Sequence, residues 1–298
     1  MGRQPKLGLA LGSGGARGWA HLGVLSVLDE MGLRADILAG ASMGALVGAA
    51  EAGGVRGELE DWAGALTQSK FLGLVDLRLS SGGLLEGREI ASVLGEWGLD
   101  CEIGSLAVPF TAVATNLETG REVWLDDGPL LPAVRASLSI PGLFAPQHLN
   151  GRWLVDGGLS NPVPISVARA KGADVIVAVN PNAKPSGRVW VPQPTTESLW
   201  SRLAGALPDA VRPDGPPDDQ DQPRAPQGAD VVAASLDMLT EYLRRTRAAA
   251  DPADVLIDID LSEFSTLAFF EAETAIAAGR AAAEAARPQI EAAMARHG

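Results

Sequence analysis

The sequence contains few cysteines and no excess of basic residues. Cys101 is the only cysteine among 298 residues, so no disulfide can form within the chain, and we expect a reducing, cytoplasmic compartment. Aspartate and glutamate (37) outnumber lysine and arginine (24), which gives a formal net charge of -13. Because binding to a phosphate backbone requires clustered basic residues, we expect no nucleic-acid partner. Any contact with a membrane is expected to be local, apolar and transient.

Long hydrophobic runs are also missing. The longest stretch of low polarity, residues 37–50, is shorter than the roughly 20 residues that span a bilayer. Hydrophobic residues nevertheless make up 46% of the chain, which is enough to bury a large core. We therefore expect one globular α/β domain over residues 1–298, with its functional motifs between residues 8 and 162.

The apolar pattern predicts strands that alternate with helices. The expected strands are 6–11, 36–39, 110–115, 121–125, 153–155, 174–179 and 254–259. The expected helices are 16–31, 129–138, 164–171, 231–249 and 266–296. Residues 139–151 are expected to be irregular, and the helix–strand–helix segment 230–298 is expected to complete the fold.

Composition changes between residues 181 and 229. Pro208–Gln227 is rich in proline, aspartate and glutamine, which predicts a disordered surface insertion and a candidate lid. Its aspartates are interpreted as solvated charge, because an unstructured run cannot hold a rigid coordination shell. We therefore expect no metal site.

The pentapeptide Gly40-Ala41-Ser42-Met43-Gly44 follows a short apolar run and precedes a helix rich in small residues. A serine at a sharp strand-to-helix turn exposes its hydroxyl, and its neighbours must be small because main chain lies close to them. This pattern predicts a nucleophile elbow. A tight strand–helix junction that merely needs glycine is the alternative interpretation.

Two further turns carry matching chemistry. Residues 12–18 form a glycine-rich loop at a helix start, where backbone N–H groups are available, and Asp156 stands between a strand and Gly157-Gly158. Acyl transfer requires a nucleophile, a base and donors for the developing oxyanion. Together with Ser42, the three turns contain one of each.

Histidine is scarce, with His21 in the first helix, His148 in a loop and His297 near the end of the sequence. A Ser-His-Asp triad in α/β-hydrolase order requires a histidine after the acid, and only His297 follows Asp156. That order argues against the α/β-hydrolase fold. A desolvated carboxylate can accept the serine proton directly, so Ser42 and Asp156 are predicted to act as a dyad.

The three turns, in this order and at these spacings, resemble those of the patatin-like phospholipases, and within them the bacterial NTE-family proteins of the RssA type. The resemblance extends to residues 136–142 and 155–162 and covers nearly the whole chain apart from 181–229. It implies a patatin-like three-layer α/β/α sandwich with a mostly parallel central sheet. It also implies a serine esterase or phospholipase that acts on acyl lipids without a cofactor.

The resemblance assigns a role to each residue of the motifs. Ser42 attacks the ester carbonyl, Asp156 takes the proton and later activates water, and Gly14, Gly15 and Arg17 form the oxyanion hole. The supporting residues are Gly12, Ser13, Gly18, Gly40, Gly44, Gly157 and Gly158. Ser13 departs from the pattern, because many members have glycine there. A structural role for the Arg17 side chain, pinning the loop to a carboxylate, is favoured over headgroup binding.

Two other functions remain open at this point. One is a nucleotide- or phosphate-binding protein that uses the 12–18 loop, although Arg17 occupies the last glycine position of that fingerprint and no Gly-Lys-Ser/Thr follows. The other is a regulatory protein that keeps the patatin fold with little or no catalysis. Labelling of Ser42 by a fluorophosphonate, together with lipid hydrolysis, distinguishes the three.

Overall fold

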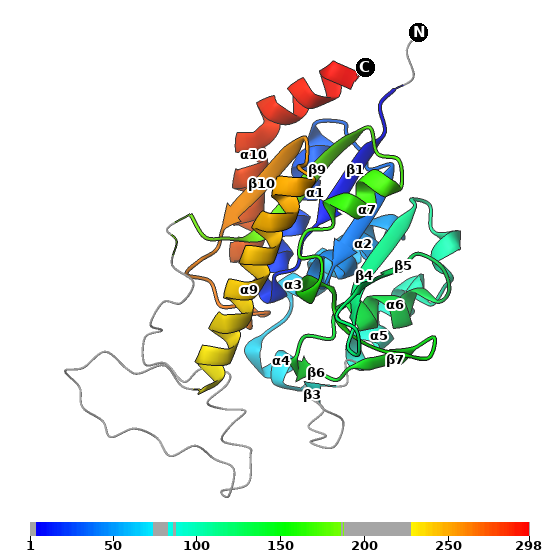
Figure 1. Ribbon diagram of the computed structural model, residues 1–298, viewed down its shortest axis with the longest axis vertical. Coiled ribbons are helices and arrows are strands. Elements are labelled where there is room, and N and C mark those ends of the chain that lie inside the picture. Colours follow the sequence, from blue (N-terminus) through cyan, green and yellow to red (C-terminus); the bar gives the residue numbers. More distant parts are fainter. Residues whose placement is uncertain (1–3, 74–82, 86–87, 186, 188–227, 298) are drawn as a thin grey trace, which may run out of the picture.

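The computed structural model describes residues 4–73, 83–85, 88–185, 187 and 228–297. A central mixed sheet, mostly parallel, is flanked by helices on both faces, as in a three-layer α/β/α sandwich (Figure 1). Helices α1, α2 and α10 contribute to the core on one face, and α7 packs on the other. The expected fold class is therefore confirmed.

The strands of the main sheet lie in the order β10-β9-β1-β2-β4-β8-β7, and β5 also pairs with β4. Strands β10, β9, β1, β2 and β4 are parallel to one another, whereas β5 and β8 run antiparallel to β4. Their bounds are β1 Leu7–Leu11, β2 Ile37–Ala41, β4 Phe110–Asn116, β5 Glu122–Leu125, β7 Gln147–Leu149, β8 Arg152–Asp156, β9 Val175–Ala183 and β10 Val255–Asp260. A second, two-stranded sheet joins β3 Gly83–Leu85 to β6 Gly142–Phe144.

The helices occupy the connections between these strands. Their bounds are α1 Ala20–Glu30, α2 Met43–Ala52, α3 Arg56–Gly64, α4 Gln68–Gly73, α5 Arg88–Leu94, α6 Leu130–Ser137, α7 Ile165–Ala170, α9 Gly228–Ala250 and α10 Ala272–His297. Among the described helices, α1 and α10 have the most extensive contact. Gly23 of α1 faces the carbonyl of Ile276, and Gly279 of α10 faces that of Ala20. The absence of side chains at these two positions lets the backbones approach closely.

Alternation along the strands explains the two cores. In β1, Leu7, Leu9 and Leu11 contribute to the larger core, whereas Ala10 contributes to the smaller core under α7. Successive side chains of a strand point to opposite faces, so a strand covered on both faces is apolar throughout. The carboxyl ends of the parallel strands then meet at one edge of the sheet, where open α/β folds place their sites.

Three expected elements differ in the structure. Residues 16–31 begin as a 3-10 turn, Gly15–Trp19, before α1. Residues 139–151 are not wholly irregular, because β6 and β7 find partners in β3 and β8 that no local pattern announces. The expected insertion at 181–229 is too long at both ends, since β9 continues to Ala183 by pairing with β10 and α9 already begins at Gly228. Its middle, 188–227, lies outside the described residues.

Candidate active site

The position of the candidate dyad follows from strand pairing along one edge of β4. Strand β2 pairs with β4 in parallel up to Ala41 and Val113, and β8 pairs with it antiparallel from Asp156 and Ala114 onward. Strand β5 occupies the other edge of β4 over the same residues. The carboxyl ends of β2 and β8 therefore meet head to head. Ser42, which follows β2, is brought to Asp156, which ends β8.

Ser42 lies in a strained turn that the surroundings hold in place. Its backbone has φ 55° and ψ -124°, a region that non-glycine residues rarely adopt. Its N–H donates to Ser137 Oγ at 2.8 Å, and Ser137 Oγ donates in turn to the carbonyl of Val113 at 2.6 Å. A Cβ atom at Gly44 would lie 2.1 Å from the carbonyl oxygen of Leu11, so the elbow requires glycine there.

Asp156 is buried and only partly hydrogen-bonded. Its Oδ1 accepts the N–H of Gly158 at 2.7 Å, whereas its buried Oδ2 has no hydrogen-bond partner of normal geometry among the described residues. Burial raises the pKa of Asp156 to about 6, against the opposing effects of hydrogen bonding from the Ser42 side chain and the Gly158 N–H. The Ser42 hydroxyl thus faces the carboxylate without closing an ideal bond, as is common at unliganded sites.

The glycine loop leaves two donors without backbone acceptors. The N–H groups of Gly12, Ser13 and Ala16 donate to the carbonyls of Val179, Pro162 and Thr266, at 2.9, 2.8 and 2.8 Å. Within the described part of the chain, no acceptor is present for the N–H groups of Gly14 and Gly15. Gly15 has φ 54°, and a Cβ there would lie 2.4 Å from the Thr266 carbonyl oxygen. These two amides are therefore available to a ligand.

His21 and Arg17 hold this loop from behind. His21 is fully buried, its Nε2 donates to the Gly12 carbonyl at 2.8 Å, and burial lowers its pKa to about 4, so the ring is neutral near pH 7. The N–H of Arg17 donates to the Gly14 carbonyl at 3.2 Å, and its Nε donates to the Phe264 carbonyl at 2.9 Å. Arg17 therefore differs from the expected oxyanion donor: its N–H is already bonded, and its side chain braces the loop.

A polar network links the glycine loop to α9. Asn182 Nδ2 donates to the Ser13 carbonyl at 2.9 Å, and its Oδ1 accepts from Arg17 Nη1 at 3.0 Å. Asp237 of α9 lies 3.2 Å from Arg17 Nη1 and 3.5 Å from Lys184 Nζ. Neither Asn182 nor Asp237 belongs to a motif. Their contacts with the glycine loop are separated by more than 160 residues in sequence, so no local signal could have identified them.

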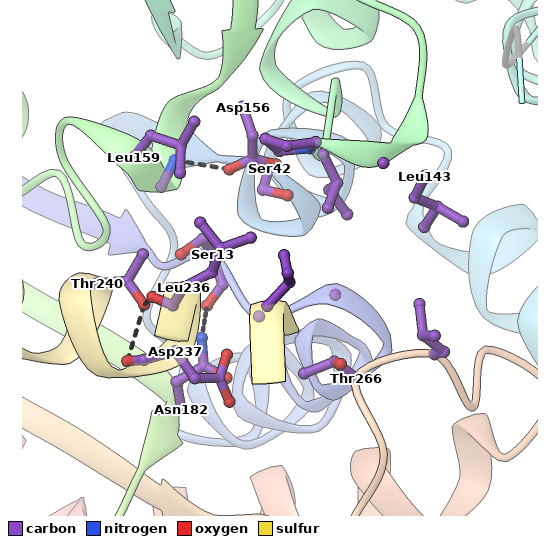
Figure 2. A pocket seen from close by; sticks show the side chains of 18 residues that line it. Ser13, Ser42, Leu143, Asp156, Leu159, Asn182, Leu236, Asp237, Thr240 and Thr266 are labelled. Atoms are coloured by element: carbon purple, nitrogen blue, oxygen red, sulfur yellow. Dashed lines mark hydrogen bonds between the residues drawn. The ribbon is translucent and has the colours of Figure 1, made fainter. Parts of the chain in front are cut away.

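Six of the predicted residues, Ser13, Gly14, Gly15, Ser42, Asp156 and Gly158, line one cavity of about 370 Å³, whereas Gly12, Gly18, Gly40, Gly44 and Gly157 lie behind them in the turns. Ser42 and Asp156 lie on one side of it, and Leu236, Asp237 and Thr240 of α9 lie on another (Figure 2). Gly14, Gly15 and Gly158 also line it, whereas Arg17 does not. The apolar lining consists mainly of Ile140, Leu143, Leu159, Val232, Leu236 and Leu267. The Ser42 side chain, a carboxylate with a raised pKa and two amides without acceptors among the described residues therefore face an apolar space.

Comparison with known proteins gives concordant matches. A family model described as patatin-like phospholipase matches residues 9–169. An NTE family protein of Mycobacterium tuberculosis is 35% identical, and the alignment covers 96% of this chain and 92% of that protein. Patatin-like phospholipase domain-containing protein 7 of Rattus norvegicus is 34% identical over 181 residues, covering 58% of this chain and 13% of that protein.

Among solved structures, VipD from Legionella pneumophila aligns with a TM-score of 0.41 and 15% identity, over 59% of this chain and 50% of that one. None of the helices in the described residues has the length and apolar character needed to cross a bilayer.

Proposed function

The chain belongs to the patatin-like phospholipase family, and on this premise we propose that it is a serine acyl hydrolase that cleaves carboxylic ester bonds of lipids. The observation that carries the proposal is the buried Oδ2 of Asp156, which has no partner of normal geometry among the described residues, in a carboxyl group that the Ser42 side chain approaches. A buried carboxylate oxygen without a partner is costly. Such an oxygen is suited to receive a proton, which is the role that we propose for Asp156.

The proposed reaction begins with attack of Ser42 Oγ on the ester carbonyl carbon while Asp156 accepts the hydroxyl proton. The negative charge that develops on the carbonyl oxygen is stabilised by the N–H groups of Gly14 and Gly15. Asp156 returns the proton to the leaving alcohol, and an acyl-enzyme remains on Ser42. Asp156 then takes a proton from water, which attacks the acyl-enzyme, and Asp156 returns that proton to Ser42 Oγ as the fatty acid leaves. The raised pKa of Asp156, about 6, strengthens it as a base near neutral pH.

The lining of the cavity supports an acyl substrate. Ile140, Leu143 and Leu267 present apolar surface close to the dyad, and the cavity volume of about 370 Å³ suits a small ligand or part of a lipid. The reaction needs no metal or cofactor, because Asp156 supplies the base and backbone amides supply the oxyanion donors. We place the activity in the cytoplasm, where the free thiol of Cys101 would stay reduced.

Labelling with a fluorophosphonate probe, followed by assays on a panel of phospholipids, lysophospholipids and neutral esters, tests the proposal. Wild type should be labelled and should hydrolyse at least one lipid class. Ser42→Ala should lose labelling and about 10³-fold or more in rate, and Asp156→Asn should lose about 10²- to 10⁴-fold. Ser262→Ala, at a half-buried serine outside the cavity, is the matched control and should behave like wild type.

Three outcomes would contradict the proposal. If Ser42→Ala is still labelled, Ser42 is not the nucleophile. Labelling of Ser42 without hydrolysis of any lipid would favour a regulatory protein that retains the fold. Binding of inorganic phosphate or a nucleotide at the 12–18 loop, with no labelling, would favour the phosphate-binding alternative.

A further inference from the structure

Helix α9 has two faces with different surroundings. Its inner face carries Leu236, Asp237 and Thr240, which line the cavity opposite the dyad (Figure 2). Its outer face is exposed and consists of Val231, Ser235, Met238, Leu239, Tyr242 and Arg245. Leu239 and Tyr242 are 66% and 72% exposed. The positions 231, 235, 238, 242 and 245 follow the helical repeat, so they form one continuous stripe.

The outer face contains no carboxylate. Within residues 231–250 the acidic side chains are Asp237 and Glu241, and both are half-buried in ion pairs. Arg245, whose side chain is 60% exposed, is the charged residue of the outer face, and its Nε pairs with Glu241 at 2.6 Å. The whole chain has a net charge of -13, so an exposed stripe that combines large apolar residues with arginine differs sharply from the protein's average charge.

Polar contacts attach α9 to the rest of the protein. Asp237 pairs with Arg17 and Lys184 at one end, and Arg247 donates to the Ser160 carbonyl at 3.1 Å and pairs with Glu122 at 2.6 Å near the other. None of the α9 side chains that the structure describes is fully buried. The helix therefore exposes much of its apolar surface while the rest of its side chains are only half-buried.

We propose that the outer face of α9 docks on the surface of a phospholipid bilayer. The inference rests on the proposed function, because the opposite face of the same helix lines the cavity that would receive an acyl chain. Leucine, methionine and tyrosine partition into the boundary between headgroups and acyl chains, and arginine reaches back to the phosphates. A bilayer is favoured over a second copy because two chains of charge -13 repel each other.

Docking through this face would place the cavity about one helix diameter, roughly 10 Å, from the bilayer that holds its lipid source. The outer face presents one stripe of apolar side chains and has no acidic residue. We therefore expect its binding to be reversible and not to require anionic lipid. Arg245 should add a modest preference for anionic lipid, which salt would weaken. The apolar contribution of Leu239 and Tyr242 should persist at high salt.

Flotation of the full chain with phosphatidylcholine vesicles tests the inference. Wild type should float with the vesicles, and Leu239→Ser/Tyr242→Ser should partition on the order of 30-fold less, since two large exposed side chains lose their apolar burial. The matched control is Leu117→Ser/Trp153→Ser, which removes two side chains that are 57% and 48% exposed in another part of the surface. This control should partition like wild type.

A second measurement separates this inference from the proposed function. The α9 double variant should hydrolyse a soluble short-chain ester like wild type but lose rate on vesicles, whereas Ser42→Ala should float normally and hydrolyse neither. Failure of wild type to float, or equal flotation of the α9 variant, would overturn bilayer docking whatever the activity. A concentration-dependent dimer that the α9 substitutions abolish would overturn it in favour of a second copy. If wild type does not hydrolyse the soluble ester, the proposed function is overturned, and the flotation result for bilayer docking is unaffected.

Discussion

On the sheet side of the cavity, Ser42 and Asp156 are 1% and 6% exposed, whereas on the opposite side α9 contributes no fully buried residue among those described. The sheet side consists of turns that follow paired strands, and backbone contacts fix its glycines. The α9 side is attached through ion pairs and hydrogen bonds. Reacting groups must keep their geometry to within fractions of an ångström, whereas a surface that admits substrates of variable length can be packed less tightly.

Helix α10 sharpens the contrast with α9. It is also long, 26 residues against 23, but it buries Ala275, Gly279, Ala283 and other small residues together with Ile290. Small side chains let α10 lie against α1, so its stability comes from close packing. Helix α9 carries large apolar residues on its exposed face instead. Two helices of similar length thus differ in packing, because one uses its apolar surface to form the core and the other keeps large apolar side chains exposed.

The largest expected effect concerns proton transfer on the sheet side. Because Asp156 must be ionised to accept a proton and its pKa is about 6, kcat/KM on a soluble ester should fall below pH 6. Between pH 7 and pH 4 the fall should reach about 100-fold. Flotation with phosphatidylcholine vesicles should change little from pH 7 to pH 5, since the α9 outer face holds no carboxylate.

The same pKa has an effect of known sign on stability. Burial raises the pKa of Asp156 from 3.8 to about 6, so the folded state binds this proton more tightly than the unfolded state. The resulting contribution to the free energy of unfolding is present below pH 3.8 and is lost as the pH rises through about 6. If the pH profile of kcat/KM has its midpoint near pH 4, the Asp156 carboxyl group is not desolvated, and the assignment of Asp156 as the base is contradicted.

A smaller effect concerns stability, and it distinguishes the packing on the sheet side of the cavity from that on the α9 side. A Cβ at Gly157 would lie 2.0 Å from the Val113 carbonyl oxygen, so Gly157→Ala should lower the free energy of unfolding by about 2 kcal/mol. Leu239→Ser on α9 should change it by less than about 0.5 kcal/mol. Urea denaturation measures both.

Gly57→Ala serves as the control for the glycine substitution. Gly57 lies in α3 with nothing near its would-be Cβ, so alanine there should be neutral or stabilising by up to about 1 kcal/mol. If Gly157→Ala and Leu239→Ser cost the same, the two sides of the cavity would not differ in packing, and the comparison would fail.

The smallest of these effects concerns the support of the nucleophile. Ser137→Ala removes the acceptor of the Ser42 N–H and the donor to Val113, which should lower kcat about tenfold with KM nearly unchanged. Ser139→Ala, two residues further on, removes a hydroxyl that bonds within its own turn and should keep kcat near the wild-type value. Equal losses in both variants would indicate a general effect of the α6 end instead of positioning of Ser42.

Much of the fold was predictable because its signals are local. Apolar runs located β1, β2, β4, β8, β9 and β10, and the glycine spacing around Ser42 and Asp156 identified the turns between them. Strands β6 and β7 escaped prediction because each is three residues long and depends on a partner distant in sequence. The 3-10 turn before α1 escaped as well, since Gly15 adopts a positive φ that depends on the approach of Thr266.

The sequence by itself determined which chemical groups the protein possesses: a serine in a tight glycine turn, an aspartate before two glycines, and a loop rich in backbone donors. Only the tertiary structure decided that β2 and β8 meet head to head along β4, that Arg17 braces the loop, and that α9 lines the cavity with one face while exposing large apolar residues on the other. The physical reason is that turn chemistry depends on neighbouring residues, whereas strand pairing, burial and the resulting pKa depend on residues that lie far apart in the sequence.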